Sequence, residues 1–158
     1  MIDMTSEEIA ALLSEKLGPK AIESKLGVVT PWTVVDPGAL LETCDFLRHD
    51  PRLLMDHLEL MGGVDFKDRI EAVYIVYSMK HRHRHTIKCR LPRENPKIRS
   101  VESVWAVANW HERETYDMFG IVFEGHSDLR RILCPDDWEG YPLRKDYKFP
   151  TRYRDMPV

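Results

Sequence analysis

Apolar residues recur with the period of an amphipathic helix in three stretches of the chain. The first stretch predicts a helix over residues 5–17 that stops at Gly18-Pro19, and the second predicts a helix that begins at Asp36-Pro37. The third predicts a helix that is capped by Ser100 and ends before Gly120. One face of this third helix carries Val101, Val104, Trp105, Ala108, Tyr116 and Phe119, with Glu112 on the same stripe.

Strands are predicted where apolar residues alternate or form β-branched runs. Residues 28–35 are β-branched but contain Pro31, which favours an edge strand. A weaker alternation extends over residues 53–66. Residues 69–79 are apolar on both faces, as is typical of a central strand. Residues 84–91 alternate between apolar and basic or polar positions, which predicts a half-buried strand that returns antiparallel to the previous one.

These elements predict an α+β fold, with helices on one face of a mixed sheet in a two-layer domain. We place this domain at residues 1–123, because residues 124–158 show neither helical nor strand periodicity. The latter segment contains four prolines and five of the fifteen aromatic residues of the chain. It is too apolar for a disordered tail. We therefore expect an irregular C-terminal extension that packs against its own domain or against another protein.

Length and charge narrow the classes of function. A chain of 158 residues fits one domain, and its net charge of −3 is too balanced for a protein that mainly grips nucleic acid. It contains no apolar stretch long enough to cross a membrane, and its acidic start does not resemble a signal peptide. The three cysteines, Cys44, Cys89 and Cys134, lie too far apart for a Cys-x-x-Cys metal site.

Two histidine patterns suggest metal binding, and the first fails on spacing. His111-Glu112 would need a second histidine at position 115, where Thr115 stands, to form a zinc-protease helix. In the second pattern, the alternating histidines of residues 81–85 lie in a basic stretch that extends from Lys80 to Arg99. That stretch lacks the aromatic residues on which nucleic-acid bases stack, so a solvated sheet face or a surface for an acidic protein is favoured.

The densest group of charges begins at Glu112. A carboxylate on an apolar stripe must find a cation or hydrogen-bond donors when it is buried. One interpretation is that an arginine of the doublet Arg130-Arg131 returns to pair with Glu112 or Glu114 and fixes the extension to the helix. The alternative is that these charges belong to a partner surface, and composition does not decide between the two.

These residues resemble a known signature. It consists of Glu112, Arg113, Glu114, Asp117, Met118, Phe119, His126, Arg130, Ile132 and Leu133. The pattern is similar to that of the C-type subunit, or 30-kilodalton subunit, of proton-pumping NADH:quinone oxidoreductase, respiratory complex I. The likeness covers about 50 contiguous residues, from Ser100 to Tyr147.

The resemblance implies a non-catalytic structural subunit of the peripheral arm that supports the B-type and D-type subunits near the quinone site. It implies that the protein itself binds no cofactor or metal, whereas the parent complex uses FMN, iron–sulfur clusters, NADH and quinone. It also implies a peripheral position on the cytoplasmic side of the inner membrane, reached only through partners, and no contact with nucleic acid. The residues expected at the partner interface or in tail docking are Arg130, Arg131, Trp138, Tyr141, Leu143, Arg144, Lys145, Asp146 and Tyr147.

Two alternatives remain open from the sequence. The same subunit role could belong to a related membrane complex of the ferredoxin-, deazaflavin- or hydrogenase-dependent type. The protein could instead be a free-standing metal or nucleic-acid binding module built on the His81–His85 hairpin.

Overall fold

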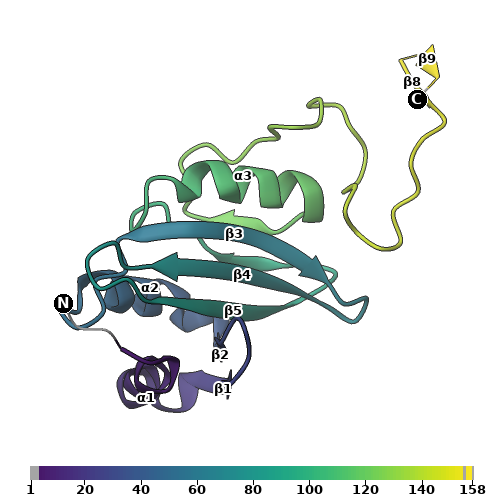
Figure 1. The fold of residues 1–158 in the computed structure, drawn as a ribbon. Coiled ribbons are helices and arrows are strands. Elements are labelled where there is room, and N and C mark those ends of the chain that lie inside the picture. Colours follow the sequence, from purple (N-terminus) through teal and green to yellow (C-terminus); the bar gives the residue numbers. More distant parts are fainter. Residues whose placement is uncertain (1–3, 155, 158) are drawn as a thin grey trace.

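The structure is a computed structural model that describes residues 4–154, 156 and 157 (Figure 1). Its helices are α1 (Ser6–Leu17), α2 (Leu40–His49) and α3 (Ala108–Phe119), with the short 3-10 helices η1 (Gly18–Lys20) and η2 (Pro37–Ala39). Its longer strands are β1 (Ala21–Lys25), β2 (Trp32–Val35), β3 (His57–Asp65), β4 (Arg69–Tyr77) and β5 (Arg84–Pro92). Its short strands are β6 (Lys97–Arg99), β7 (Val122–Glu124), β8 (Arg152–Tyr153) and β9 (Met156–Pro157).

The five longer strands form one mixed sheet in the order β1-β2-β5-β4-β3. Strands β2 and β5 are parallel, and the other neighbouring pairs are antiparallel. Alternate residues of β4, from Ile70 to Val76, share one hydrophobic core with buried residues of α1, α2 and α3. Figure 1 shows α3 alongside β3 and the last part of the chain extending away from the sheet. The predicted α+β class, with helices on one face of a mixed sheet, is confirmed.

Local sequence explains the clearest helix ends. At the start of α1, the Thr5 hydroxyl accepts from the Glu8 N–H while the Glu8 carboxylate accepts from the Thr5 N–H, a complete capping box. At the end of α3, Gly120 adopts a φ of 75° and donates its N–H to the Tyr116 carbonyl. A side chain at position 120 would strain this left-handed conformation, so glycine fits the stop.

The predicted edge strand over residues 28–35 is wrong in position. Only Trp32–Val35 is a strand, and it lies inside the sheet, between β1 and β5. Pro31 precedes the strand and accepts a hydrogen bond from the Thr86 N–H through its carbonyl, so its missing donor costs the sheet nothing. The edge strand on this side of the sheet is β1, which was not predicted because four of its five residues are exposed and leave no apolar pattern.

The predicted helix start at Ser100 is also wrong. Helix α3 begins at Ala108, and residues 101–107 form successive turns. These turns place Val101, Val104 and Trp105 in the core at a spacing that imitates a helix. Trp105 is further fixed by a 3.0 Å hydrogen bond from its Nε1 to the Met55 carbonyl.

The three histidines of residues 81–85 are buried rather than arranged along an exposed hairpin end. His81 and His83 precede β5, and their Nε2 atoms lie 3.0 Å and 2.8 Å from the carbonyl oxygens of Pro51 and Leu53. His85 faces the core, and burial lowers its pKa to about 4. His85 therefore stays neutral at physiological pH.

Candidate partner interface

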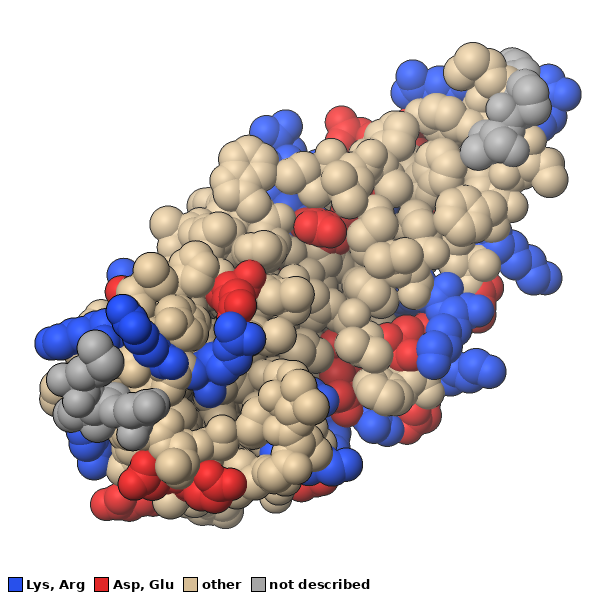
Figure 2. All heavy atoms as spheres, in the orientation of Figure 1, with Lys and Arg blue, Asp and Glu red and all other residues tan. Residues whose placement is uncertain are grey.

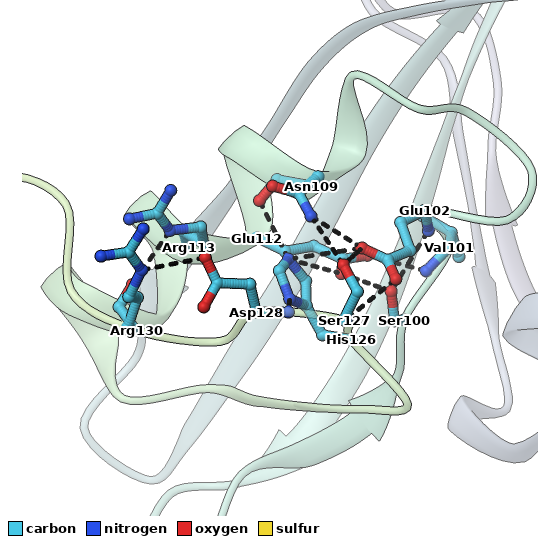
Figure 3. A network of polar contacts seen from close by, with 10 residues as sticks. All are labelled: Ser100, Val101, Glu102, Asn109, Glu112, Arg113, His126, Ser127, Asp128 and Arg130. Carbon is cyan, nitrogen blue, oxygen red and sulfur yellow. Dashed lines mark hydrogen bonds and ion pairs between the residues drawn. The ribbon is translucent and has the colours of Figure 1, made fainter.

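Glu112 occupies the centre of a buried polar network between α3 and the turn that precedes it (Figure 3). Its Oε2 accepts from the Ser100 hydroxyl at 2.6 Å, and its Oε1 accepts from the Val101 N–H at 2.7 Å. Burial raises the pKa of Glu112 to about 7, although these two hydrogen bonds favour the ionised form. The carboxyl group thus holds residues 100 and 101 against the helix.

His126 extends this network to the segment after β7 (Figure 3). Its fully buried ring places Nε2 at 3.0 Å from the Asn109 carbonyl oxygen and at 4.0 Å from Glu112 Oε2. Its Nδ1 accepts from the Asp128 N–H at 2.9 Å, so the neutral ring carries its proton on Nε2 and donates it to Asn109. The ring consequently fixes the start of the C-terminal segment to α3.

Glu102 completes the network beside a surface pocket. Its carboxylate accepts from Asn109 Nδ2 at 2.8 Å and from the Ser127 N–H at 2.8 Å. Burial alone would raise the pKa of Glu102, but the hydrogen bonds from Asn109 and Ser127 hold it below its ordinary value. The adjoining pocket has a volume of about 560 Å³, and Trp110 stands at its wall.

Arg113 and Asp117 both bind the C-terminal segment, from positions four residues apart on α3. The Arg113 guanidinium donates to the carbonyl oxygens of Arg130 at 3.2 Å and Arg131 at 3.1 Å. Asp117 Oδ1 accepts from Arg131 Nη1 at 2.6 Å. Each of the two therefore satisfies groups of a distant segment instead of forming the local pair that the spacing suggests.

Asp117 also accepts from three consecutive backbone groups. Its Oδ2 lies 3.1 Å from the Ile132 nitrogen, 2.7 Å from that of Leu133 and 2.8 Å from that of Cys134. Burial opposes the charge, yet these donors and Arg131 keep the pKa of Asp117 below its usual value. Consecutive N–H groups around one carboxylate form an anion-binding nest. The ionised Asp117 thus orders residues 131–134 on α3.

The interpretation in which an arginine of the doublet pairs with Glu112 or Glu114 is wrong, because both arginines bind elsewhere. Arg131 pairs with Asp117, and Arg130 forms an exposed ion pair with Asp128. Glu112 takes its donors from the preceding turn, because it faces the turn side of α3 rather than the side covered by the doublet. Glu114 is exposed.

The segment then closes over the end of α3. Arg131 Nη2 donates to the carbonyl oxygens of Trp138 and Gly140, at 2.9 Å each, and its guanidinium lies 5.5 Å from the centre of the Tyr141 ring. The Tyr141 ring occupies the space that a Cβ at Gly120 would need. Gly120 therefore serves both the helix stop and the close approach of the C-terminal segment.

The last carbonyl groups of α3 find their donors in the same segment. The Leu143 N–H donates to the Met118 carbonyl at 3.1 Å, and Arg144 Nε donates to the Phe119 carbonyl at 2.7 Å. These carbonyls have no partner within the helix, and a cation suits the negative end of the helix dipole. The C-terminal segment thus caps α3.

A charged clasp joins the segment to the sheet. Arg93 donates to both oxygens of Asp65, at 3.1 and 3.0 Å, and to both oxygens of Asp146, at 3.1 and 2.6 Å. The Lys145 N–H also donates to Asp65 Oδ2, at 2.9 Å. The Arg93 guanidinium and these N–H groups hold the pKa of the buried Asp65 far below its usual value. The chain is therefore anchored to the end of β3 where it leaves the domain.

Beyond this clasp the chain projects from the domain (Figure 1). Asp137, which precedes the clasp, accepts from Tyr153 Oη at 2.5 Å and from Arg154 Nη2 at 2.9 Å, so the end of the chain folds back onto the part before the clasp. Trp138 and Tyr153 pack together with ring centres 5.2 Å apart. Figure 2 shows basic side chains at the far end of this projection.

The residues predicted for the interface or for tail docking thus fall into two groups. Side chains with contacts inside the protein are those of Arg130, Arg131, Trp138, Tyr141, Arg144, Asp146 and Tyr147. The side chains of Leu143 and Lys145 are exposed. Whether either group contacts a partner remains a prediction.

Sequence reasoning missed Asp65 and Arg93. Asp65 meets the segment across 80 residues of sequence, and Arg93 meets it across 53; no periodic pattern links such distant positions. The available signal was the acidic residue at the end of an apolar alternation, with an arginine directly after the second strand that follows it.

No helix in residues 4–154, 156 and 157 is long and apolar enough to cross a membrane. Within the same residues, no three His, Cys, Asp or Glu side chains are grouped so that they could hold a metal ion.

Comparison with known families gives a decisive match. The sequence model of the 30 kDa subunit of the respiratory-chain NADH dehydrogenase matches residues 33–153. The protein belongs to this family. The match includes the whole α3 network and the docked C-terminal segment, and it confirms the resemblance that was drawn from residues 100–147.

Curated relatives of this 30 kDa subunit family carry the name of the C-type subunit of NADH-quinone oxidoreductase. The relative from Chloroherpeton thalassium is 45% identical over 93% of this chain, which spans 62% of that relative's length. The relative from Chlorobium phaeobacteroides is 39% identical over 100% of this chain and 99% of its own length. A relative from Rhizobium meliloti, the second C-type subunit by its name, is 50% identical over 77% of this chain and 67% of its own.

Two solved structures have a similar fold. The trypsin-resistant fragment 1–134 of Nqo5 is 28% identical with a TM-score of 0.64, over 77% of this chain and 98% of the fragment. A component of the membrane-bound sulfane sulfur reductase, an archaeal respiratory membrane complex, is 29% identical with a TM-score of 0.64, over 90% of this chain and 85% of its own.

Proposed function

We propose that this protein is a structural subunit of the peripheral arm of a proton-translocating NADH:quinone oxidoreductase. Residues 1–123 would form the body of the subunit, and residues 124–158 would extend from it to pack on the D-type and B-type subunits near the quinone site. The names of the curated relatives support the parent complex. The role of the extension is our inference from its contacts.

The proposal rests on the contacts and the exposure of the side chains in the C-terminal segment. Three of its charged side chains, those of Arg131, Arg144 and Asp146, bind α3 or the clasp at the end of β3. Four of its large apolar side chains, those of Leu133, Leu143, Phe149 and Met156, are each more than half exposed. An ordered segment that exposes apolar side chains is suited to a partner protein, because it binds with a small loss of conformational entropy.

We assign the redox centres to neighbouring subunits and propose that this protein adds no catalytic residue. FMN, the iron–sulfur clusters, NADH and quinone would then be bound elsewhere in the complex. Metal analysis of the purified protein tests this assignment, since a stoichiometric cluster or metal would contradict it. We also propose a position on the cytoplasmic side of the membrane, held there through partners.

A second candidate differs only in the parent complex. The likeness to a component of an archaeal sulfane sulfur reductase complex favours a subunit type that serves several membrane complexes. Neighbouring genes would separate the candidates, because a gene for an NADH-binding subunit supports the first. A free-standing module built on the histidine hairpin is disfavoured, because His81, His83 and His85 are buried and make internal contacts.

The proposal is tested by tagging this protein in its own cells and identifying the proteins that copurify. We expect B-type and D-type subunits in stoichiometric amounts. The variants Leu143→Asp and Phe149→Asp place a charge on the exposed apolar surface of the segment and should reduce this recovery. Met79→Asp is the matched control, because Met79 is similarly exposed but lies in the β4–β5 turn. Equal recovery with all three variants would contradict a partner role for the segment.

A further inference from the structure

The sheet has a second face, which the helices do not cover. Cross-strand partners share a face of a sheet, so the register identifies the side chains that lie opposite the core. One row across the five strands consists of Lys25, Trp32, Thr86, Ile75 and Leu60. The next row consists of Glu23, Val34, Lys88, Val73 and Gly62. We call these two rows, together with Val64, the outer face.

The outer face is more apolar than a solvated face should be. In a sheet that is covered on one side, residues of the water side are usually polar, which produces alternation along each strand. Strand β4 departs from this rule, because Val73 and Ile75 point away from the core and are only half-buried. On β3, Leu60 and Val64 are 46% and 41% exposed. The sequence of β4 is thus that of a strand covered on both sides, whereas the protein itself covers Val73 and Ile75 only in part.

A groove runs over this face. The loop that connects β1 to β2 carries Val28, Val29 and Thr30, and together with the sheet it encloses a volume of about 480 Å³. Val73, Ile75 and Val64 are among the residues that line the groove, and Val29 at its wall is fully exposed. A concave apolar surface of this kind is typical of protein docking sites.

The charges around the groove determine which kind of partner fits. The arginines of this face are already neutralised: Arg90 pairs with Glu23 and Glu71, and Arg84 pairs with Glu59. Among the described residues, Lys25 and Lys88 form no ion pair, although both line the groove. The Lys88 ammonium lies 4.4 Å from the centre of the Trp32 ring. The groove therefore presents two uncompensated positive charges beside an apolar floor.

We propose that the outer face is a second docking surface, separate from the C-terminal segment, which receives an apolar segment of another subunit flanked by carboxylates. Carboxylates of that segment would pair with Lys25 and Lys88, and its apolar side chains would cover Val64, Val73 and Ile75. Complementary charge at the edge of an apolar contact fixes register and excludes partners of the wrong sign. This inference depends on the proposed function in one respect: the protein must belong to a complex of several subunits.

The experiment measures the accessibility of the outer face in the purified complex. Val64→Cys is made in a Cys134→Ser background, where the remaining cysteines, Cys44 and Cys89, are buried. The rate of labelling by a maleimide is compared between the complex and the isolated protein. We expect labelling to be at least about tenfold slower in the complex, since opening of an interface precedes reaction. Met79→Cys is the control and should label at the same rate in both.

Equal labelling of Val64→Cys in the complex and in the isolated protein would overturn the proposal. A zero-length carbodiimide then identifies the occupant of a protected face. Links from Lys25 or Lys88 to an Asp or Glu of another subunit support the proposal, and links only to a second copy of this protein overturn it. If no complex copurifies at all, the proposed function fails instead, so the two failures are distinguishable.

Discussion

Replacing Glu112 with glutamine should remove a pH dependence from the stability of this protein. The side chain of Glu112 is fully buried, and burial raises its pKa to about 7 from an ordinary value of 4.5, with hydrogen bonds from Ser100 and Val101 limiting the rise. His126 and Glu102 are the titratable groups beside it. Glutamine keeps an acceptor for the Val101 N–H but cannot ionise.

The direction and size of the effect follow from proton linkage. The folded protein holds the Glu112 proton more tightly than the unfolded one, so this contribution is fully present below about pH 4.5 and is lost as the pH rises to about 7. The pKa difference between the two states, at about 1.4 kcal/mol per pH unit, corresponds to about 3 kcal/mol of unfolding free energy. That is a large part of the stability of a typical domain, roughly 5–15 kcal/mol.

The assay is urea unfolding of the wild type and of Glu112→Gln between about pH 4.5 and pH 8. The stability of the variant relative to the wild type should increase by about 3 kcal/mol over this window and then level off. Asp65 and Asp117 titrate at lower pH in both proteins, so they cancel in the difference. Glu114→Gln, an exposed change on the same helix, should show no such trend. A pH-independent difference for Glu112→Gln would refute the argument.

Three further predictions concern the C-terminal segment. Asp117→Ala leaves Arg131 and three backbone N–H groups without their acceptor; it should lower stability by about 3–5 kcal/mol in urea unfolding and speed hydrogen exchange at those amides. Arg93→Ala should leave the fold intact but speed hydrogen exchange in the segment that the clasp holds, and unchanged exchange would argue against the clasp. Brief trypsin treatment should cut after the exposed Lys148 or Arg152 well before Arg131, and early cleavage at Arg131 would contradict its burial.

The sequence correctly predicted the elements that are determined by residues close together in the chain. Helix α1 was found because its cap, apolar stripe and stop all lie between Thr5 and Gly18. Strand β4 was found because its sequence is a continuous apolar run, and β5 was found because apolar and polar residues alternate along it. The end of α3 was predicted from Gly120, since its left-handed conformation is one that glycine adopts easily.

Other features depend on contacts that a local pattern does not record. Strand β1 is an exposed edge whose pairing to β2 decides its structure, and α3 starts late because the buried Glu112 draws residues 100 and 101 out of the helix. The partners of Asp117 and Asp65 are chosen by tertiary proximity. The signature residues were recognisable from the sequence. The pairing between individual arginines and carboxylates was not.

Strand β4 has an apolar outer side that was already visible in the sequence. The run from Ala72 to Tyr77 predicted a strand covered on both faces, and in the structure the outer side chains of Val73 and Ile75 are covered only in part. The strand prediction was therefore correct, and the unexplained half of its pattern becomes the reason to expect a second docking surface.

We propose that this protein supports the assembly of the complex and takes no part in its chemistry. The most direct test is the NADH:quinone reductase turnover per assembled complex in cells that carry the double variant Leu143→Asp/Phe149→Asp. The account predicts that less complex assembles and that each assembled complex turns over at the wild-type rate. A normal amount of complex with a lowered turnover would contradict it.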